Sequence, residues 1–478
     1  MRHVPQYMPG VCHRGFIMIN LAIDGIKTAV RPGTTVLQAA LQIGIKIPAL
    51  CYNEKTGPLA SCLLCLVKVN GQKRLLPSCA LPAAEGMIIE SEIPEVINER
   101  RRSLSLLLGE HRGDCISPCK RACPIHADIP LVLRFQAKND PMQASRLAML
   151  PLPRITCSLC PAPCIKACRR KLHADKNGPL RIKDLLMHAG SFYTEPRERF
   201  FGAVAVIGSG PAGLSAAWYL QRAGIKTTVF EKEKNIGRVF FKYLDRKLAE
   251  DTISDLFKDG IVFMTGREFS SADIFSAVIN ASGSNLEISG YRLFNTEKSS
   301  RKVSPFIDAV SAGIKQARLC ASFVNNTPEM LFDSKFGKVD EQAMQEFSRH
   351  AENTFPACLK DTQDIIDEAG RCLECDCRKD RNCRLRQYAD DFKIQSAVQS
   401  EKLPFTRRRL GELLMENGKC IKCGICVRLT EKSGRGFCFE KRGFNTRITV
   451  PAGVNALDIQ SVMDECIRLC PTGALTKH

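Results

Sequence analysis

The sequence predicts a multidomain protein that combines α+β and α/β domains, and three observations predict it. The 24 cysteines of the 478-residue chain gather in short, closely spaced groups, as metal-binding loops do. A strand, a glycine-rich turn and a helix follow one another from residue 203, which indicates one dinucleotide-binding fold. The length allows two to four domains, each with its own core.

The composition favours a protein of the reducing cytoplasm. Hydrophobic residues make up 44% of the chain and charged residues 25%, as in globular proteins. No apolar run approaches the roughly 18 residues of a membrane span, and we find no secretory signal. Residues 1–15 lack a periodic pattern and are expected to be a disordered leader. We therefore expect the cysteines to bind metal rather than to form disulfides.

The net charge of +19 does not indicate a nucleic-acid partner. A cluster held by four thiolates carries a net charge of roughly −2, so four or five clusters would remove about eight to ten charges. The remaining basic residues are spread along the chain, for example at Arg100–Arg102, Arg169–Lys171 and Arg407–Arg409, without interleaved aromatic residues. We interpret them as a solvated face or a docking surface for an acidic redox partner.

The first ordered segment is expected to begin with a hairpin. Strands are predicted at Phe16–Leu21 and Ile26–Val30, with the turn at Asp24-Gly25, and a helix that ends at Gly44 follows. Four cysteines come next, in the pattern Cys51-x10-Cys62-x2-Cys65-x13-Cys79.

This spacing, together with Ser61-Cys-Leu-Leu-Cys-Leu-Val-Lys-Val69, resembles a known domain. It is the [2Fe–2S] ferredoxin domain of the large iron–sulfur subunit of NADH:quinone oxidoreductase and of iron hydrogenases. The resemblance implies a β-grasp domain over residues 16–92, with the four cysteines on one two-iron cluster.

A second cysteine-rich segment, residues 111–168, follows a predicted amphipathic helix at 93–110. Its eight candidate ligands are His111, Cys115, Cys119, Cys123, Cys157, Cys160, Cys164 and Cys168. A cysteine at every third or fourth residue in two groups favours two four-iron clusters. Zinc is the main alternative, and a set of inert buried cysteines is the weaker one.

Two resemblances overlap in this segment. His111-x3-Cys115 resembles the box of one histidine and three cysteines that follows the ferredoxin domain in NADH:quinone oxidoreductase. The remainder, including Cys160-Pro-Ala-Pro-Cys164, resembles the helical domain of the glutamate synthase small subunit and of dihydropyrimidine dehydrogenase. That resemblance implies a helical domain over residues 93–198 with two [4Fe–4S] clusters. The chain lacks the first two cysteines of the usual leading motif. We interpret His111 and Cys157 as their replacements; for His111, a surface or helix-capping role is the alternative.

The strand Ala203–Ile207 runs into Gly208-Ser-Gly210-Pro-Ala-Gly213, and Glu231 ends the next predicted strand. The glycines let the backbone approach a pyrophosphate, and the helix N-terminus faces its charge. Glu231 can accept a hydrogen bond from a ribose hydroxyl. The candidate cofactor-binding residues are therefore Gly208, Gly210, Gly213 and Glu231. Resemblance to the glutamate synthase small subunit, in the FAD-dependent pyridine nucleotide-disulfide oxidoreductase family, implies that the cofactor is FAD.

The flavin domain is expected to span residues 199–325 and to be a truncated Rossmann-like fold. The paired glycines of the family are replaced by Gly237-Arg238, and only about twenty residues separate Gly283 from a predicted helix that begins near Val303. We find no second glycine fingerprint, so the NAD(P)H domain of the family is expected to be missing. A scaffold that keeps the fold without the ligand is the alternative.

Residues 326–410 are expected to be a linker that ends in a compact cysteine-rich segment. The candidate ligands there are Cys372, Cys375, Cys377 and Cys383. Their spacing leaves two interpretations open, a further [4Fe–4S] cluster and a structural zinc site.

The C-terminal part, residues 411–478, resembles a bacterial-type ferredoxin domain like the one in NADH:quinone oxidoreductase. The resemblance implies one [4Fe–4S] cluster on Cys420, Cys423, Cys426 and Cys470, because the positions that would complete a second cluster hold other residues. The remaining cysteines that we interpret as small buried hydrophobes are Cys320, Cys358, Cys438 and Cys466.

These domains together favour an electron-transfer subunit of a soluble multi-subunit oxidoreductase. We expect one [2Fe–2S] cluster, two to four [4Fe–4S] clusters and FAD, with ferredoxin-like or flavin-bearing subunits as partners. A self-contained NAD(P)H-dependent oxidoreductase like the glutamate synthase small subunit is one alternative. A non-catalytic scaffold that carries clusters beside a decayed flavin site is the other.

Overall fold

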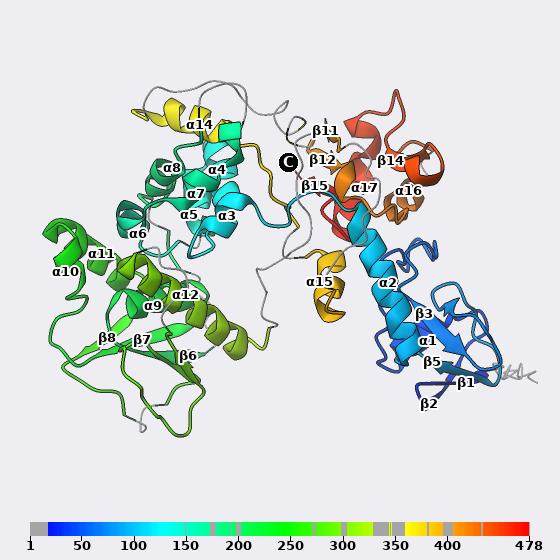
Figure 1. The fold of residues 1–478 in the computed structure, drawn as a ribbon, viewed down its shortest axis with the longest axis horizontal. Helices are drawn as coiled ribbons and strands as arrows, with labels where there is room; N and C mark the ends of the chain where they lie inside the picture. The colour runs from blue at the N-terminus through cyan, green and yellow to red at the C-terminus, as the bar shows by residue number, and fades with distance from the viewer. Residues whose placement is uncertain are drawn as a thin grey trace, which may run out of the picture. The chain divides into compact units, whose positions relative to one another are not determined.

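The structure is a computed structural model of the chain. The residues that it describes are 18–148, 150–172, 178–192, 194–196, 202–270, 274–297, 304–327, 344, 346, 359–379, 382–394, 405–431 and 434–477, so the expected leader at 1–15 lies outside them. They form two compact units, which we describe separately (Figure 1). The flanking unit contains the described residues of Met1–Gly113 and Arg378–His478, and the central unit those of Asp114–Ser334 and Val339–Cys377. In sequence, the central unit is therefore inserted between two halves of the flanking unit.

The flanking unit begins with a five-stranded mixed sheet in the order β2-β1-β5-β3-β4. Its elements are β1 (Ile19–Ile23), β2 (Ile26–Val30), α1 (Val36–Gln42), β3 (Leu66–Val69), β4 (Leu76–Pro77) and β5 (Met87–Glu90). The predicted hairpin is confirmed: β1 and β2 pair antiparallel, and Asp24 and Gly25 take φ of 46° and 80° at the turn, the left-handed values that a tight hairpin needs. Thr35 and Gln38 form a capping box at the start of α1.

The rest of the flanking unit consists of α2 and the C-terminal part of the chain. Its elements are α2 (Pro94–Glu110), α15 (Arg384–Asp391), β11 (Arg407–Leu410), β12 (Leu413–Glu416), α16 (Ile425–Thr430), β13 (Cys438–Glu440), β14 (Arg447–Thr449), α17 (Ala456–Leu469) and β15 (Leu475–Lys477). Strands β11, β12 and β15 form an antiparallel sheet, and β13 pairs with β14. Helix α2 confirms the helix predicted at 93–110.

The central unit begins with short helices. They are α3 (Pro118–Ala122), α4 (Ile129–Ala137), α5 (Pro141–Ala148), α6 (Pro153–Leu159), α7 (Pro163–Ala167) and α8 (Ile182–Ala189), joined later in the chain by α14 (Thr362–Gly370). Proline lies in the first turn of α3, α4, α6 and α7, where its missing N–H leaves no intrahelical bond unmade. Cysteines occupy the C-cap positions of α3, α6 and α7, so each of these helices ends at a thiol.

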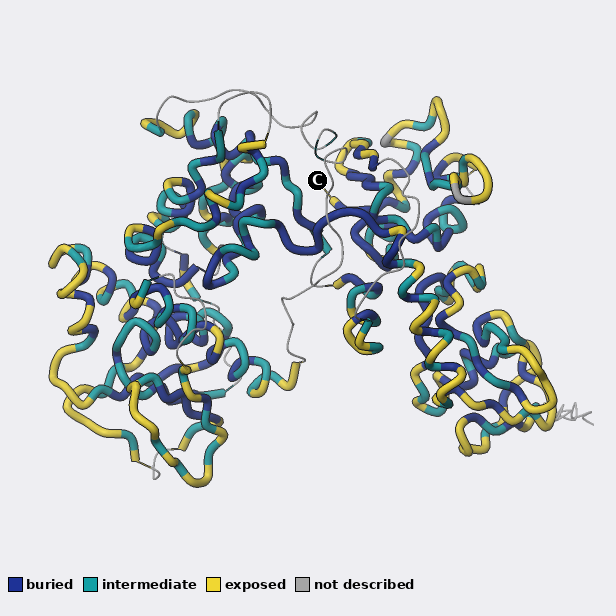
Figure 2. Tube along the Cα trace, viewed as in Figure 1, coloured by how far each residue is buried: buried dark blue, intermediate teal, exposed yellow. Residues whose placement is uncertain are grey.

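The second part of the central unit is a parallel five-stranded sheet in the order β10-β9-β6-β7-β8. Its elements are β6 (Ala203–Ile207), α9 (Pro211–Arg222), β7 (Lys226–Glu231), α10 (Phe240–Tyr243), α11 (Arg246–Lys258), β8 (Val262–Thr265), β9 (Ala277–Asn280), β10 (Leu293–Asn295) and α12 (Pro305–Val324). The central strands are almost wholly buried (Figure 2). This order, with the glycine turn after the central strand β6, is that of a doubly wound nucleotide-binding fold.

Helix α12 packs closely against α9 behind the glycine turn (Figure 1). A Cβ atom on Gly313 of α12 would lie 2.1 Å from the carbonyl oxygen of Ala212, so only glycine fits there. The predicted helix near Val303 is thus present, and it supports the first turn of α9. Among the helices of the described residues, none combines the length and the apolar character that a membrane crossing requires.

Replacing Gly313 with alanine is expected to separate α12 from α9. The added methyl group meets backbone, which cannot rotate away, and overpacking of this kind costs about 1–3 kcal/mol. Hydrogen exchange in the full chain should become faster in both α9 and α12. Lys315→Ala, at an exposed position on the same helix, is the control and should leave exchange unchanged. Equal protection in the two variants would contradict the close approach.

Candidate metal centres

The four N-terminal cysteines converge in the flanking unit. Cys51, Cys62, Cys65 and Cys79 are all buried, and they come from the loop after α1, the loop before β3 and the end of β4. Hydrogen bonds from Cys62 and Cys79 lower the pKa of the Cys51 thiol. A hydrogen bond from Cys79 likewise lowers the pKa of Cys65 to about 7. The four sulfur atoms are therefore close enough to interact directly.

Backbone N–H groups also point at this set. The N–H of Leu50 donates to Sγ of Cys62 at 3.4 Å, and Leu63, between the two loop cysteines, takes φ of 53°. Left-handed residues turn successive N–H groups toward one side of a loop, which makes a concave anion site. The loop thus provides the N–H donors that a buried cluster sulfur or thiolate needs.

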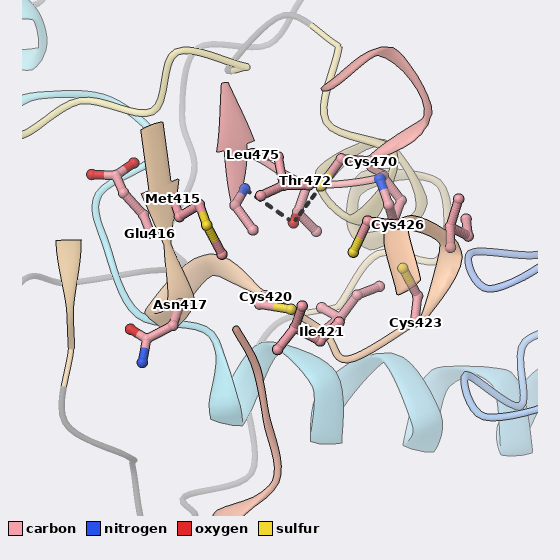
Figure 3. Close-up of a pocket in the computed structure, with 14 residues that line it drawn as sticks. Met415, Glu416, Asn417, Cys420, Ile421, Cys423, Cys426, Cys470, Thr472 and Leu475 are labelled. Atoms are coloured by element: carbon pink, nitrogen blue, oxygen red, sulfur yellow. Dashed lines mark hydrogen bonds between the residues drawn. The ribbon is translucent and has the colours of Figure 1, made fainter. Parts of the chain in front are cut away.

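A second set of thiols lines a cavity in the C-terminal part of the flanking unit (Figure 3). Its members are Cys420, Cys423, Cys426 and Cys470. Apolar side chains such as Met415 and Leu475 complete the wall, and burial raises the pKa of Cys420 to about 12. The N–H of Lys422, which has φ of 54°, donates to Sγ of Cys420 at 3.3 Å. Thr472, beside Cys470, donates its hydroxyl to the carbonyl of Lys419 at 2.7 Å and fixes the far side of the cavity.

The two sets of the flanking unit share one apolar cluster. Cys51 and Cys62 lie in it with Cys423 and Ile425. The negative charge of Cys51 contributes to the raised pKa of Cys423, after burial and the charges of its own set. Arg428 on α16 donates to the carbonyl oxygens of Pro58 and, at 3.2 Å, of Cys51. This guanidinium therefore ties the first thiol loop to the second.

A third set lies in the central unit and consists of Cys123, Cys157, Cys160 and Cys164. These residues sit at the ends of α3 and α6, within α6 and within α7. Burial raises the pKa of Cys157, and the charges of the other three thiols raise it further. Backbone N–H groups of Ala127 and Ile125 donate to Cys123. The thiols thus form one electrostatic group on a small helical scaffold.

Two cysteines of the predicted 372–383 segment lie near other thiols of the central unit. Cys372 and Cys375 lie near Cys119 and Cys168, whose charges act on one another. Cys383 instead belongs to the flanking unit, in an apolar cluster with Leu385 and Ala389. The expectation of one four-thiol site within these twelve residues stays a prediction, because its cysteines are assigned to two different units.

The two residues that we interpreted as replacements in the leading motif, His111 and Cys157, are both buried, and their role as ligands stays a prediction. Cys157 belongs to the third set, and His111 is the buried C-cap residue of α2 in the flanking unit. Cys115 is buried in the central unit.

The other cysteines were expected to be small buried hydrophobes. Cys320 and Cys466 are buried, with 0% and 1% of their surface exposed, which confirms the expectation for both. Cys438 lies on strand β13 and is only half-buried. Cys358 lies outside the described residues.

The candidate nucleotide site is at the carboxyl end of β6 and β7. Gly208 takes φ of 100°, and a Cβ atom on Gly213 would lie 1.9 Å from the carbonyl oxygen of Gly208, so the turn requires both glycines. The carboxylate of Glu231 accepts from the N–H and the hydroxyl of Ser209 and from the N–H of Glu233. Burial alone would raise the pKa of Glu231, but these hydrogen bonds hold it below its usual value. Glu231 is thus a charged acceptor beside the glycine turn.

Comparison with known proteins supports the N-terminal thiol site and the nucleotide-binding fold. Residues 17–94 match the family of 2Fe–2S iron–sulfur cluster binding domains, and residues 206–259 match an NAD(P)-binding Rossmann-like domain. The prediction of a [2Fe–2S] domain is confirmed. The second match is described as NAD(P)-binding, whereas we predicted FAD. FAD therefore stays a prediction.

The relatives are subunits of redox enzymes. A subunit of the NADH-quinone oxidoreductase of Rhizobium meliloti (strain 1021) is 44% identical over 98 residues, which are 20% of this chain and 12% of that protein. NADP-reducing hydrogenase subunit HndD of Solidesulfovibrio fructosivorans is 36% identical over 140 residues, 27% of this chain and 23% of that protein. The NADH-ubiquinone oxidoreductase 75 kDa subunit of Reclinomonas americana is 39% identical over 98 residues, which are 20% of this chain and 14% of that protein. The chain thus spans less than a quarter of these relatives.

A solved structure, NAD+-reducing [NiFe]-hydrogenase in the H2-reduced state, aligns with 96% of this chain and 87% of that chain. The TM-score is 0.36 and the sequence identity 14%, values too low to carry an argument about fold.

Replacing Arg428 with glutamine is expected to loosen the loop of residues 49–59. The variant loses charge-assisted hydrogen bonds to two carbonyl groups, each worth about 1.5–3 kcal/mol. Hydrogen exchange of that loop should become roughly ten-fold faster or more. Arg435→Gln is the matched control, because Arg435 is exposed and pairs with Asp458 on the surface. Unchanged exchange in Arg428→Gln would show that the guanidinium does not hold the loop.

Proposed function

We propose that this protein is an iron–sulfur electron-transfer subunit of a multi-subunit oxidoreductase. The observation that carries the proposal is the shared apolar cluster of the flanking unit, which contains thiols of two separate four-cysteine sets, Cys51 and Cys423 among them. Two redox centres held this close, with little water between them, suit the passage of single electrons. The relatives, which are named as subunits of NADH-quinone oxidoreductase and of hydrogenase, support it.

The N-terminal set fits a [2Fe–2S] cluster. Its four thiols come from one small domain, interact directly and receive backbone N–H groups. A bound cluster would supply reversible one-electron chemistry. The residues of the chain hold it, exclude water and set its potential through burial and N–H bonds to sulfur.

The second and third sets fit [4Fe–4S] clusters. The second set lines an apolar cavity and the third lies in the apolar core of the central unit, and each has backbone N–H groups directed at sulfur. Within the described residues, no three or more His, Cys, Asp and Glu side chains are arranged to hold a single metal ion. A four-iron cluster takes one thiolate at each of its four irons, which four converging cysteines can supply.

The central unit would provide a nucleotide-binding site in addition to the clusters. The glycine turn, the N-terminus of α9 and Glu231 suit the pyrophosphate and ribose of a dinucleotide. FAD remains our proposal for the ligand, and NAD(P) is the alternative that the family match favours. Flavin-bearing or ferredoxin-like subunits are the proposed partners, and the cytoplasm is the proposed compartment.

Two other functions remain as alternatives. A self-contained oxidoreductase like the glutamate synthase small subunit would need a second nucleotide-binding sheet, and the described residues contain one parallel sheet with one glycine turn. A scaffold with a decayed nucleotide site would be expected to lose the close glycine packing, yet Gly208 and Gly213 keep it. Both observations favour the electron-transfer subunit.

Replacing Cys62 with serine is expected to abolish or grossly change one EPR signal, that of the reduced [2Fe–2S] cluster. The thiolate is one of four ligands, and a serine oxygen changes both cluster stability and electronic structure. EPR of the anaerobically purified full chain is the measurement. Cys438→Ser, outside all four-cysteine sets, should leave every signal intact. A normal [2Fe–2S] signal in Cys62→Ser would exclude the assignment of that cysteine.

The chain without partners is expected not to oxidise NADH or NADPH at a useful rate. A hydride carries two electrons and clusters accept one at a time, so a nicotinamide must stack on a flavin. Two facing nucleotide-binding folds are needed for that, and the described residues contain one parallel sheet with one glycine turn. Stopped-flow mixing with each nucleotide, monitored by bleaching of cluster absorbance, measures this. Bleaching only after a flavin-bearing partner is added would agree with the proposal, whereas rapid bleaching of the isolated chain would favour the self-contained oxidoreductase.

A further inference from the structure

We propose that Cys119, Cys168, Cys372 and Cys375 bind one four-iron cluster, which fastens the segment 359–376 to the helices of the central unit. The proposal rests on the proposed function, because it requires that the chain carries clusters. It differs from any grouping that sequence spacing suggests, since about 200 residues separate Cys168 from Cys372.

The four thiols come from three segments of the central unit. Cys119 lies in α3, Cys168 is the C-cap residue of α7, and Cys372 and Cys375 follow α14. Helix α3 packs on α7, and α14 packs on α4. Cys168 belongs to the apolar core of the central unit, and Cys119 and Cys372 pack against that core. The charges of Cys375, Cys372 and Cys168 all act on Cys119, which is consistent with the four thiols facing one another.

The loop of Cys372 and Cys375 has the geometry of the C-terminal thiol loop. Glu374 takes φ of 47°, and its N–H donates to Sγ of Cys372 at 3.4 Å. In the corresponding place Lys422 takes φ of 54° and donates to Cys420 at 3.3 Å. A left-handed conformation costs a non-glycine residue about 1–2 kcal/mol. Both loops adopt it at the second residue after a cysteine, where it directs an N–H at sulfur.

Contacts on both sides of the cysteine pair hold this loop in place. Before the pair, Arg371 and Glu368 form a fully buried ion pair at 2.7 Å, and Glu368 also accepts from the N–H of Arg181 at 2.8 Å. After the pair, Asp376 accepts two hydrogen bonds from one nitrogen of Arg134, at 2.8 and 3.1 Å, and a third from the other nitrogen at 3.1 Å. These buried charges, costly to separate, fix the direction of the two thiols.

The surrounding charges suit an anionic cluster. A [4Fe–4S] cluster with four thiolates carries a net charge of roughly −2. Arg169, next to Cys168, has its charge close enough to act on Cys375, and it pairs with Asp114. Asp114 and Asp376 also act on Cys375, and each of these carboxylates has an arginine as partner.

The test compares metal content and local protection in the full chain, purified anaerobically. Cys375→Ser and Cys119→Ser, which change two different segments of the site, should each lose about four iron atoms and four sulfides per chain, the content of one [4Fe–4S] cluster. Hydrogen exchange of residues 359–376 should become faster in both variants, although Cys119 is far away in sequence. Cys320→Ala, which removes a buried thiol of the same unit outside all sets, should change neither quantity.

The other possible outcomes distinguish failure of the proposed function from failure of this inference alone. Wild-type protein without iron and sulfide would overturn the proposed function itself. Full iron in both serine variants, with the [2Fe–2S] signal still sensitive to Cys62→Ser, would overturn only this inference. Loss of one zinc ion instead of iron would also overturn it in favour of a structural zinc site. Exchange of β6 and β7 reports general unfolding, and the expected result requires that these strands stay protected.

Discussion

The burial of several cysteine thiols in each of a few small apolar volumes is the constraint on which the rest of this structure depends. An unpaired buried charge is costly, and the chain offsets that cost with backbone N–H groups at short range. Ala162, Glu374 and Lys422 show how: each takes a left-handed conformation two residues after a cysteine and donates its N–H to that sulfur. The backbone strain at these positions is therefore part of the thiol sites.

The same constraint explains the short helices around the thiols. Helices α3 and α7 have five residues each and α6 has seven, because the chain must return to the buried thiols after every one or two turns. Each of these helices begins with proline in its first turn and has a cysteine at its C-cap position. Such helices are too short to be stable alone, so packing around the thiols must hold them.

Basic side chains serve a purpose that composition did not indicate. We expected the positive charge to form a solvated face or a docking surface, yet Arg100, Arg170, Arg371 and Lys419 are among the largest fully buried side chains. Arg100 donates to the carbonyl of Leu66, as Arg428 does to that of Cys51. Part of the basic excess is therefore structural, because a guanidinium can satisfy buried carbonyls and carboxylates at once.

The sequence by itself determined the local features of this protein: the hairpin at Asp24-Gly25, the glycine turn before α9, and the thiol loops, in which donors and ligands lie within a few residues of one another. Only the tertiary structure decided which distant segments meet. Cys372 and Cys375 lie with Cys119 and Cys168, about 200 residues or more earlier in the chain. Buried pairs such as Arg134–Asp376 decide this, and spacing along the chain carries no information about such long-range contacts.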